Sequence, residues 1–295
     1  MNEFTVVICT YNRHKIIDKC LTKILQNSIL PKKIIVVDQN NNSLTVQKIK
    51  KIFNNYNYKN FIILKNILQR GLTKSKNISL KYCNTKYIFF IDDDIFLEKY
   101  YFHKNLDLIF KKKALGVCGI ISNYKKNWIK NFIYYSLNFN IFRDNRYYFI
   151  NYLKLKKIKY YSKIFQLPGG ITCFDKKIFK KIQFDEKYLT HNYEDVEFNL
   201  RIKKNFYKSN LFIHLNAKAV DGLEKSIKEN LFSRIYFMRL LYLRNKKPKF
   251  LIYFNLSLFS ILISNFYNLR FCDYKKIIIS LKTAKKKYLN DNTQP

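Results

Sequence analysis

The sequence predicts an α/β fold with a doubly wound, mostly parallel sheet and helices on both of its faces. Apolar runs with many β-branched residues alternate with amphipathic helical stretches over residues 1–100. Continuous apolar strands separated by helices are typical of parallel sheets that are buried on both sides. The chain has 295 residues, 48% of them hydrophobic, which is enough for one large domain with a filled core.

Each strand of the predicted sheet is a short apolar run bounded by polar or turn-forming residues. The strands are expected at Phe4–Cys9, Lys33–Val37, Phe61–Leu64, Tyr87–Ile91, Val117–Ser122 and Leu215–Val220. The helices are expected at His14–Gln26, Leu44–Phe53, Thr73–Tyr82, Lys176–Ile182 and Tyr193–Lys204. The last of these helices opens with acidic residues and ends with cations, which is the order that a helix dipole favours.

Beyond Asp221 the chain is expected to be helical to its end. We therefore divide the sequence into an α/β domain at 1–222 and a basic, apolar helical extension at 223–295. Residues 250–269 of this extension carry no charge, and a helix of that length can span a membrane. Asparagine and serine interrupt the segment, so a buried or membrane-surface helix is favoured and a spanning helix stays as the alternative.

The chain is strongly basic, with 56 Lys and Arg against 20 Asp and Glu and a formal net charge of +36. Such a charge attracts polyanions: nucleic acid, anionic lipid headgroups or phosphorylated substrates. The lysines are scattered rather than gathered in one tail, so a general compositional bias explains the charge equally well. Six cysteines without a CxxC pair, and an N-terminus without a signal-peptide pattern, favour a reducing, cytoplasmic compartment.

Polar residues follow three of the predicted strands, at the sheet edge where ligands bind in open α/β folds. They are Thr10, Tyr11 and Arg13 after the first strand, Asp38 after the second, and Asp92-Asp93-Asp94 after the fourth. A carboxylate at a strand end can accept hydrogen bonds from a base or a ribose, and an arginine can meet a phosphate in fork geometry. The three strand ends together predict a nucleotide site.

Three adjacent carboxylates at the end of a buried strand are the sharpest single feature of the sequence. Asp92, Asp93 and Asp94 repel one another unless water or a cation neutralises them. In extended backbone, Asp92 and Asp94 would point to the same face. Mg²⁺ takes only one or two protein carboxylates and completes its shell with phosphates and water, as a departing diphosphate requires. The triplet therefore predicts a Mg²⁺ or Mn²⁺ site, and a solvated acidic turn is the alternative.

A second acidic cluster, Glu194-Asp195, falls at the predicted start of a helix. A carboxylate there could accept the proton of an attacking hydroxyl group, as general-base catalysis requires. The helix dipole and a nearby metal favour the ionised form, whereas neighbouring acids oppose it. Simple capping of the helix by acidic residues is an equally good explanation of this segment taken alone.

In this order, the motifs resemble the family 2 glycosyltransferases of GT-A fold, over residues 5 to about 245. Val6 to Arg13 resembles the opening strand and nucleotide loop of the family. Ile35 to Gln39 resembles its second motif, and Arg70 to Asn77 the glycine-containing helix start that lines the donor site. Asp92 to Asp94 resembles the DXD motif. Gly169-Gly170 and Phe184 to Glu186 match an acceptor-side segment, and Glu194-Asp195 matches the ED motif.

The resemblance implies a role for each matching residue. Asp38 would contact the base, and Gly71, Lys74 and Asn77 would line the donor site with Thr10, Tyr11 and Arg13. Asp92 would lie closer to the ribose, and Asp93 would belong to the donor site. Asp94 would be the main metal ligand with Asp92, and Asp195 beside Glu194 would be the catalytic base. Two positions depart from the pattern. Lys76 stands where relatives often have arginine, and His214 or Asp221 stands near an expected histidine ligand, which leaves His214 as a candidate for the metal.

The implied activity is an inverting transfer of a sugar from a nucleotide-diphosphate donor to a hydroxyl of a saccharide or lipid-linked saccharide, in the synthesis of cell-surface polysaccharide or other glycans. The basic, aromatic stretch at 128–165 and the cationic C-terminal helices would hold the acceptor or an anionic membrane surface, which places the protein peripherally at the inner face of the membrane. A sugar nucleotidyltransferase and a non-enzymatic nucleic-acid-binding protein are the alternatives. The first normally needs a Gly-rich N-terminal loop, and the second leaves the acidic triplet unexplained, so no nucleic acid is expected.

Overall fold

A computed structural model describes residues 3–68, 70–123, 160–186, 194–206 and 210–222, and scattered helical positions between 239 and 286. The chain divides into two compact units. The first comprises Met1–Trp128, Asn145–Leu189 and Glu194–Glu224, and the second comprises Ile129–Asp144, Thr190–Tyr193 and Lys225–Pro295. The aromatic stretch predicted at 128–165 and the extension predicted at 223–295, including 250–269, lie almost entirely outside the described residues. None of the helices in the described part is both long and apolar enough to cross a membrane.

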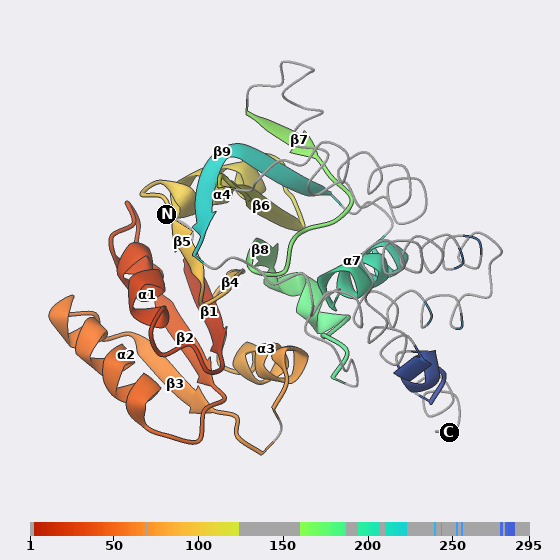
Figure 1. The fold of residues 1–295 in the computed structure, drawn as a ribbon. Coiled ribbons are helices and arrows are strands. Elements are labelled where there is room, and N and C mark those ends of the chain that lie inside the picture. The colour runs from red at the N-terminus through yellow and green to blue at the C-terminus, as the bar shows by residue number, and fades with distance from the viewer. Residues whose placement is uncertain are drawn as a thin grey trace. The chain divides into compact units, whose positions relative to one another are not determined.

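The first unit alternates strands and helices along its N-terminal half (Figure 1). The strands are β1 (Phe4–Thr10), β2 (Lys33–Asp38), β3 (Phe61–Lys65), β4 (Tyr87–Ile91), β5 (Ile95–Leu97), β6 (Gly116–Ile121), β7 (Tyr161–Lys163), β8 (Ile171–Asp175) and β9 (Leu211–Asp221). The α-helices are α1 (Ile17–Leu25), α2 (Leu44–Asn55), α3 (Leu72–Leu80), α4 (Tyr101–Lys111) and α7 (Glu194–Asn205), and η1 (Lys176–Lys180) is a 3₁₀ helix. Most predicted elements are present within one to three residues of their expected ends.

The described strands form one nine-stranded sheet in the order β3-β2-β1-β4-β8-β6-β9-β5, with β7 paired to β9. The first four strands of this order are parallel. Beyond β4 the pairing is mixed: β8 is antiparallel to β4 and β6, β9 is parallel to β6, and β5 is antiparallel to β9. The predicted doubly wound α/β class is confirmed, with its parallel pairing concentrated in the N-terminal half.

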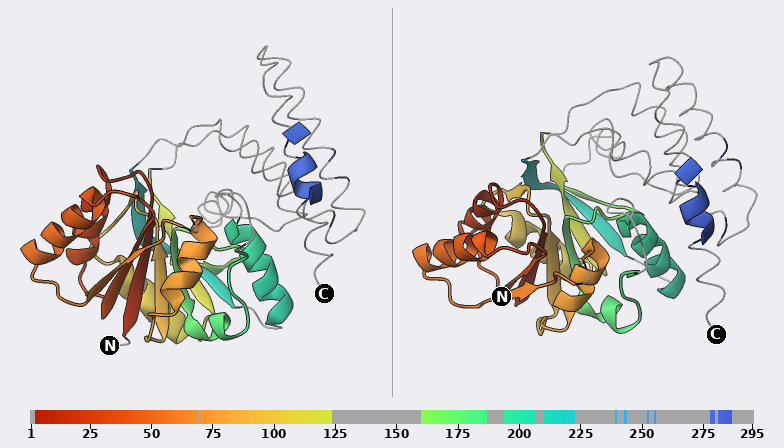
Figure 2. Two further views of the ribbon diagram at one scale, coloured as in Figure 1. Left: turned by 90° about the horizontal axis from the view of Figure 1, so that it is seen from below. Right: turned by 60° about the horizontal axis from the view of Figure 1, so that its bottom comes forward.

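The central strand β4 supplies aromatic residues to both faces of the sheet, because successive side chains of a strand point to opposite sides. Phe89 packs against Phe4 and Phe102, with ring centroids 5.3 and 4.9 Å away. Its neighbour Phe90 packs instead on Phe184, 5.4 Å away, in a cluster with Phe179 and Phe198. Figure 2 shows the matching layers, with α1 and α2 on one side of the sheet and α3 and α7 on the other. The sheet is therefore covered on both faces, as its uninterrupted apolar strands predict.

The acidic triplet after β4 is a turn, and not a continuation of the strand. β4 ends at Ile91, and the backbone N–H of Ile95 donates to the carbonyl of Asp92 over 3.1 Å. The chain then continues in β5, which pairs antiparallel with the end of β9. The prediction that Asp92 and Asp94 share a face in extended backbone is therefore wrong. The turn instead directs Asp93 and Asp94 to a common partner.

Candidate active site

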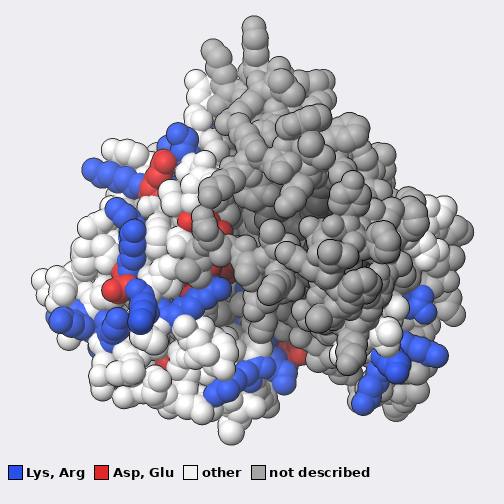
Figure 3. Space-filling model, in the orientation of Figure 1, with Lys and Arg blue, Asp and Glu red and all other residues white. Residues whose placement is uncertain are grey.

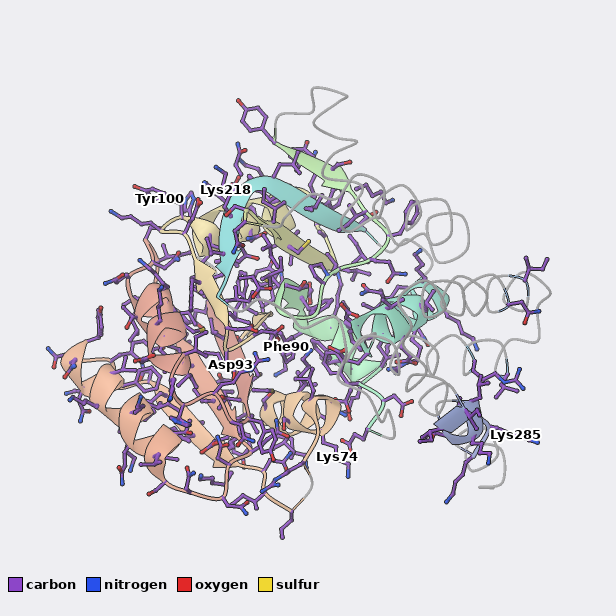
Figure 4. All side chains as sticks on the ribbon, viewed as in Figure 1. Lys74, Phe90, Asp93, Tyr100, Lys218 and Lys285 are labelled. Atoms are coloured by element: carbon purple, nitrogen blue, oxygen red, sulfur yellow. The ribbon has the colours of Figure 1, made fainter. Side chains whose placement is uncertain are left out.

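The strand ends that the sequence singles out meet at one edge of the sheet. Thr10, the last residue of β1, pairs with Asp38, the last residue of β2. The acidic turn follows β4, which is the other parallel neighbour of β1. Figure 4 labels Asp93 near the middle of the sheet, beside the ends of β1 and β4. Parallel pairing thus brings together residues that lie up to about eighty positions apart in the sequence.

Arg13 bridges two of the three aspartates. Its Nη1 lies 2.9 Å from Oδ1 of Asp93 and 2.6 Å from Oδ2 of Asp94. The two carboxylates are almost fully buried, at 6% and 2% exposure, whereas the arginine side chain is 39% exposed. Burial raises the pKa of Asp93 to about 6, although the Arg13 guanidinium opposes the rise. One partly exposed arginine thus pairs with two buried carboxylates and limits the rise in the pKa of Asp93.

Asp92 lies apart from this pair and packs on the backbone of Gly170. The Asp92 backbone N–H donates to the Gly170 carbonyl over 2.9 Å. A Cβ atom built on Gly170 would lie only 2.0 Å from Oδ2 of Asp92, so a side chain there would force the carboxylate or the turn to move. Glycine at position 170 thus allows the close approach of the β4 end to the loop before β8.

Asp195, the predicted base, contacts the same turn from its other end. The backbone N–H of Gly169 donates to Oδ2 of Asp195 over 3.0 Å. The N–H of Val196 donates to the other oxygen over 2.8 Å. Asp195 is partly exposed in the first turn of α7, whereas Glu194 beside it is buried. The acidic turn after β4 and the acidic pair of α7 therefore contact the same pair of glycines, and their joint role in a site stays a prediction.

Lys76 is buried between these elements, on α3. Its Nζ lies 3.3 Å from Oε1 of Glu194 and 3.4 Å from the carbonyl of Gly169. Burial, the largest single effect, lowers the pKa of Lys76, but the negative charges of Glu194, Asp92 and Asp195 together outweigh it, so the pKa is raised. Burial also raises the pKa of Glu194, against the pull of the ammonium. The sequence drew attention to Lys76 only as a replacement for arginine, and gave no signal of its buried partner.

Asp38 is fully buried, and its carboxylate is used within its own loop. Oδ1 accepts hydrogen bonds from the backbone and side-chain nitrogens of Asn40, over 3.0 and 2.7 Å. Oδ2 pairs with Nζ of Lys65 at 2.7 Å, and that ammonium also donates to the carbonyls of Asn40 and Asn42. The predicted contact of Asp38 with a base stays a prediction. In the structure, Asp38 fixes the shape of the loop that follows β2, together with Lys65, a partner that the sequence did not reveal.

The segment at the start of α3 contains residues that were predicted to line the donor site. Gly71 has a φ of 151°, which favours glycine, and its N–H donates to Oε1 of Gln39 over 2.7 Å. The exposed Tyr11 ring lies 5.2 Å from the guanidinium of Arg70. Lys74 is partly exposed on the same helix (Figure 4).

Asn77, which was also expected to line the donor site, is buried and bonded elsewhere. Its side chain exchanges two hydrogen bonds with the backbone of Phe184, over 2.9 and 3.0 Å. A third hydrogen bond joins it to Oε1 of Glu186 over 2.9 Å. Asn77 therefore ties α3 to the segment that contains Phe184 and Glu186, and its predicted contact with the donor stays a prediction.

His214 lies too far along β9 to join the acidic turn. It pairs with Tyr161 of β7, and its Nδ1 accepts from the backbone N–H of Asn216 over 3.2 Å. The other end of β9 reaches the turn, where the N–H of Gly222 donates to the Asp94 carbonyl over 2.8 Å. Seven residues of strand separate His214 from Asp221, a distance of roughly 20 Å. The prediction of His214 as a metal ligand is corrected, and Asp221 is the residue of the two that lies beside the turn.

The acidic turn fits a metal ion only in part. Among the described residues, no three His, Cys, Asp or Glu side chains are grouped as ready metal ligands. Mg²⁺ and Mn²⁺ nevertheless need only one or two protein carboxylates when a diphosphate supplies further oxygens. Asp93 and Asp94 offer such oxygens, which are now bonded to Arg13. The donor chemistry fits a divalent cation that arrives with a phosphate ligand.

The comparison with protein families decides the class of the chain. The sequence model of Glycosyl transferase family 2 matches residues 5–183, which is more than half of the chain. The chain belongs to glycosyltransferase family 2. The matched region contains the nucleotide loop, the acidic turn and the Gly169-Gly170 turn, and it stops before α7. The comparison of this glycosyltransferase with curated proteins gives no match.

Solved GT-A glycosyltransferases share the fold of this family 2 glycosyltransferase. S. aureus TarS 1-349 in complex with UDP-GlcNAc has a TM-score of 0.63 at 16% identity, covering 97% of this chain and 81% of that one. The mannosyltransferase PcManGT from Pyrobaculum calidifontis, with GDP-Man and Mn²⁺, has a TM-score of 0.61 at 13% identity, covering 98% and 88%. The match covers only 49% of a longer TarS structure. At such identities the likeness shows the fold alone.

Proposed function

We propose that this protein transfers a sugar from a nucleoside-diphosphate donor to a hydroxyl group of a saccharide or lipid-linked saccharide, in a single inverting displacement. The observation that carries the proposal is the shared Gly169-Gly170 turn. Asp92 packs on one end of this turn, and Asp195 accepts a hydrogen bond from the other. A donor-side carboxylate and a candidate base therefore lie close together, as a direct attack on the donor requires.

Asp195 is the better candidate for the general base of the two acids in α7. Its carboxylate is partly exposed, so an acceptor hydroxyl can reach it, whereas Glu194 is buried against Lys76. In the proposed step the hydroxyl proton passes to Asp195 while the oxygen attacks the anomeric carbon from the face opposite the leaving diphosphate. The bond to the diphosphate breaks as the new glycosidic bond forms, and the configuration at the anomeric carbon is inverted.

Arg13, Tyr11 and the acidic turn form the proposed donor site. The guanidinium of Arg13 could bind a phosphate in fork geometry, and the exposed Tyr11 ring is available for stacking on a base. Asp94, with Asp92 or Asp93, would hold Mg²⁺ or Mn²⁺, and the bound ion would neutralise charge that develops on the leaving diphosphate. The structure of the mannosyltransferase PcManGT with GDP-Man and Mn²⁺ supports this assignment by analogy.

The basic surface supports an anionic acceptor or membrane face without identifying it. In Figure 3, Lys and Arg lie scattered over the described surface with few Asp and Glu among them. A scattered charge favours loose attraction to an anionic membrane over one specific groove. We propose that 223–295 is a separate extension that contributes to this peripheral association, in the synthesis of a glycan at the cell surface.

Thermal stabilisation by donors, combined with a transfer assay, tests the proposed function. Nucleoside diphosphates and sugar nucleotides should raise the Tm only when Mg²⁺ or Mn²⁺ is also present. Asp195→Asn should keep that shift and lose about 10²- to 10⁴-fold in transfer, because only proton removal is lost. Asp107→Asn, which changes an exposed acid that pairs with Lys111 on α4, serves as the matched control and should behave as the wild type. Normal transfer by Asp195→Asn, or the absence of any donor-dependent shift, would contradict the proposal.

A further inference from the structure

The stability of the fold does not by itself explain why a charged side chain, Lys76, is buried at this position. Its side chain is 2% exposed, and the Phe90 and Phe184 ring centroids lie 5.7 and 5.1 Å from Nζ. Buried ion pairs are often no more stabilising than apolar residues of the same volume. An apolar pair would suit this aromatic environment, so the retained charge suggests a role in geometry.

The geometry that Lys76 controls is that of the Gly169 peptide group. The carbonyl of Gly169 faces Nζ of Lys76 at 3.4 Å, and its N–H donates to Asp195. A Cβ atom on Gly169 would lie 2.9 Å from Oε1 of Glu194, 3.2 Å from Cβ of Asp195 and 3.3 Å from Nζ of Lys76, so these three side chains enclose the glycine. The next carbonyl, that of Gly170, accepts from the backbone N–H of Asp92. One short segment is thus held by α3, by α7 and by the end of β4.

We propose that Lys76 is a positioning residue for sugar transfer, which orients the Gly169-Gly170 turn and through it fixes the Asp195 carboxylate relative to Asp92. The inference rests on the proposed function, in which Asp195 is the base. The Lys76 side chain is only 2% exposed, so we propose that it acts through the turn and not by direct contact with either substrate. Its effect is therefore on the rate of the transfer step, with little effect on the affinity for the donor.

A set of four variants separates positioning from stability. Lys76→Met leaves Glu194 buried without its cation and should lower the Tm, so it is paired with Lys76→Met/Glu194→Gln, which removes both charges. Glu194→Gln alone measures the effect of removing the acid. Lys76→Arg keeps a cation that can donate to both Glu194 and the Gly169 carbonyl. For each variant, kcat, the KM for the donor and the Tm are measured on the full chain with a sugar nucleotide and Mn²⁺.

The double variant should recover most of the Tm lost in Lys76→Met while its kcat stays about 10- to 100-fold below the wild type, with the donor KM within about threefold. Glu194→Gln and Lys76→Arg should keep kcat within several-fold of the wild type. The inference is overturned if kcat recovers together with the Tm in the double variant, or if Glu194→Gln is as slow as the double variant. Asp195→Asn, assayed in parallel, distinguishes failure of the proposed function from failure of this inference. Normal transfer by Asp195→Asn refutes Asp195 as the base. Loss of transfer by Asp195→Asn, combined with normal kcat in the double variant, refutes only the role of Lys76.

Discussion

Gly170→Ala is the most direct test of how the two acidic clusters are joined. The added methyl group would lie 2.0 Å from Oδ2 and 2.1 Å from Cγ of Asp92, where ordinary van der Waals contact begins near 3.4 Å. The carboxylate, or the glycine turn itself, must therefore move by about 1.4 Å. Because the backbone N–H of Gly169 donates a hydrogen bond to Asp195, a shift of the turn also moves this candidate base.

The structure predicts a larger effect on catalysis than on stability. Overpacking of a filled site typically costs about 1–3 kcal/mol, and Asp92 is only partly buried, so the loss in unfolding free energy should be about 1 kcal/mol. A displacement of about 1 Å between reacting groups costs on the order of 10²-fold in rate. We therefore expect kcat/KM to fall about 100-fold, which corresponds to about 2.7 kcal/mol of transition-state stabilisation.

The assay compares kcat/KM with the urea-induced unfolding free energy for Gly170→Ala and for Gly119→Ala. In the control, the new methyl group would lie 2.1 Å from the carbonyl oxygen of Ala217, a backbone atom on β9. The control should therefore lose more stability but keep its turnover per folded molecule. A Gly170→Ala variant with kcat/KM within threefold of the wild type would refute the argument, and so would an equal loss of turnover in the control.

Two further predictions concern charges that the sequence did not pair. Arg13→Gln removes the cation that competes with a metal ion for the oxygens of Asp93 and Asp94. The affinity for Mn²⁺, measured by calorimetry, should therefore rise about tenfold, equivalent to about 1.4 kcal/mol. An unchanged or weaker affinity would contradict this competition. Lys65→Met leaves the buried Asp38 carboxylate and the loop carbonyls without the ammonium group that binds them, so the unfolding free energy should fall by about 1–3 kcal/mol. Adding Asp38→Asn should restore most of this loss. A single variant as stable as the wild type would count against the role of Lys65 in forming the loop.

The parallel half of the sheet could be predicted from sequence because each of its strands is an uninterrupted apolar run. β4 is an example: its residues are all buried, and its start and end agree with the prediction. The nucleotide-side residues could be placed for the same reason, since parallel strands bring their carboxyl ends to one edge. The acidic pair of α7 was found from its position at a helix start, which local sequence also encodes.

The contacts between distant segments could not be predicted, because no local pattern records them. The turn at Asp92 looks like a continuation of β4 until the hydrogen bond from Ile95 is seen. Lys65 and Lys76 are two lysines in a chain rich in lysine, and only tertiary packing distinguishes them from solvated ones. The sequence suggested His214 through a family pattern, yet its position along β9 is fixed by the pairing with β7.

The charges at the acidic turn also explain why the donor and the cation should bind together. Arg13 balances one of the two negative charges on Asp93 and Asp94, so this group carries a net negative charge. A divalent cation alone would reverse that sign, and a doubly charged pyrophosphate alone would be repelled by it. Arriving together they leave the charge of the buried group unchanged, and Arg13, displaced from the carboxylates, can turn to the phosphates. Mutual dependence of metal and donor binding therefore follows from the Arg13 bridge, and independent binding of either partner at full affinity would show that the bridge does not open in this way.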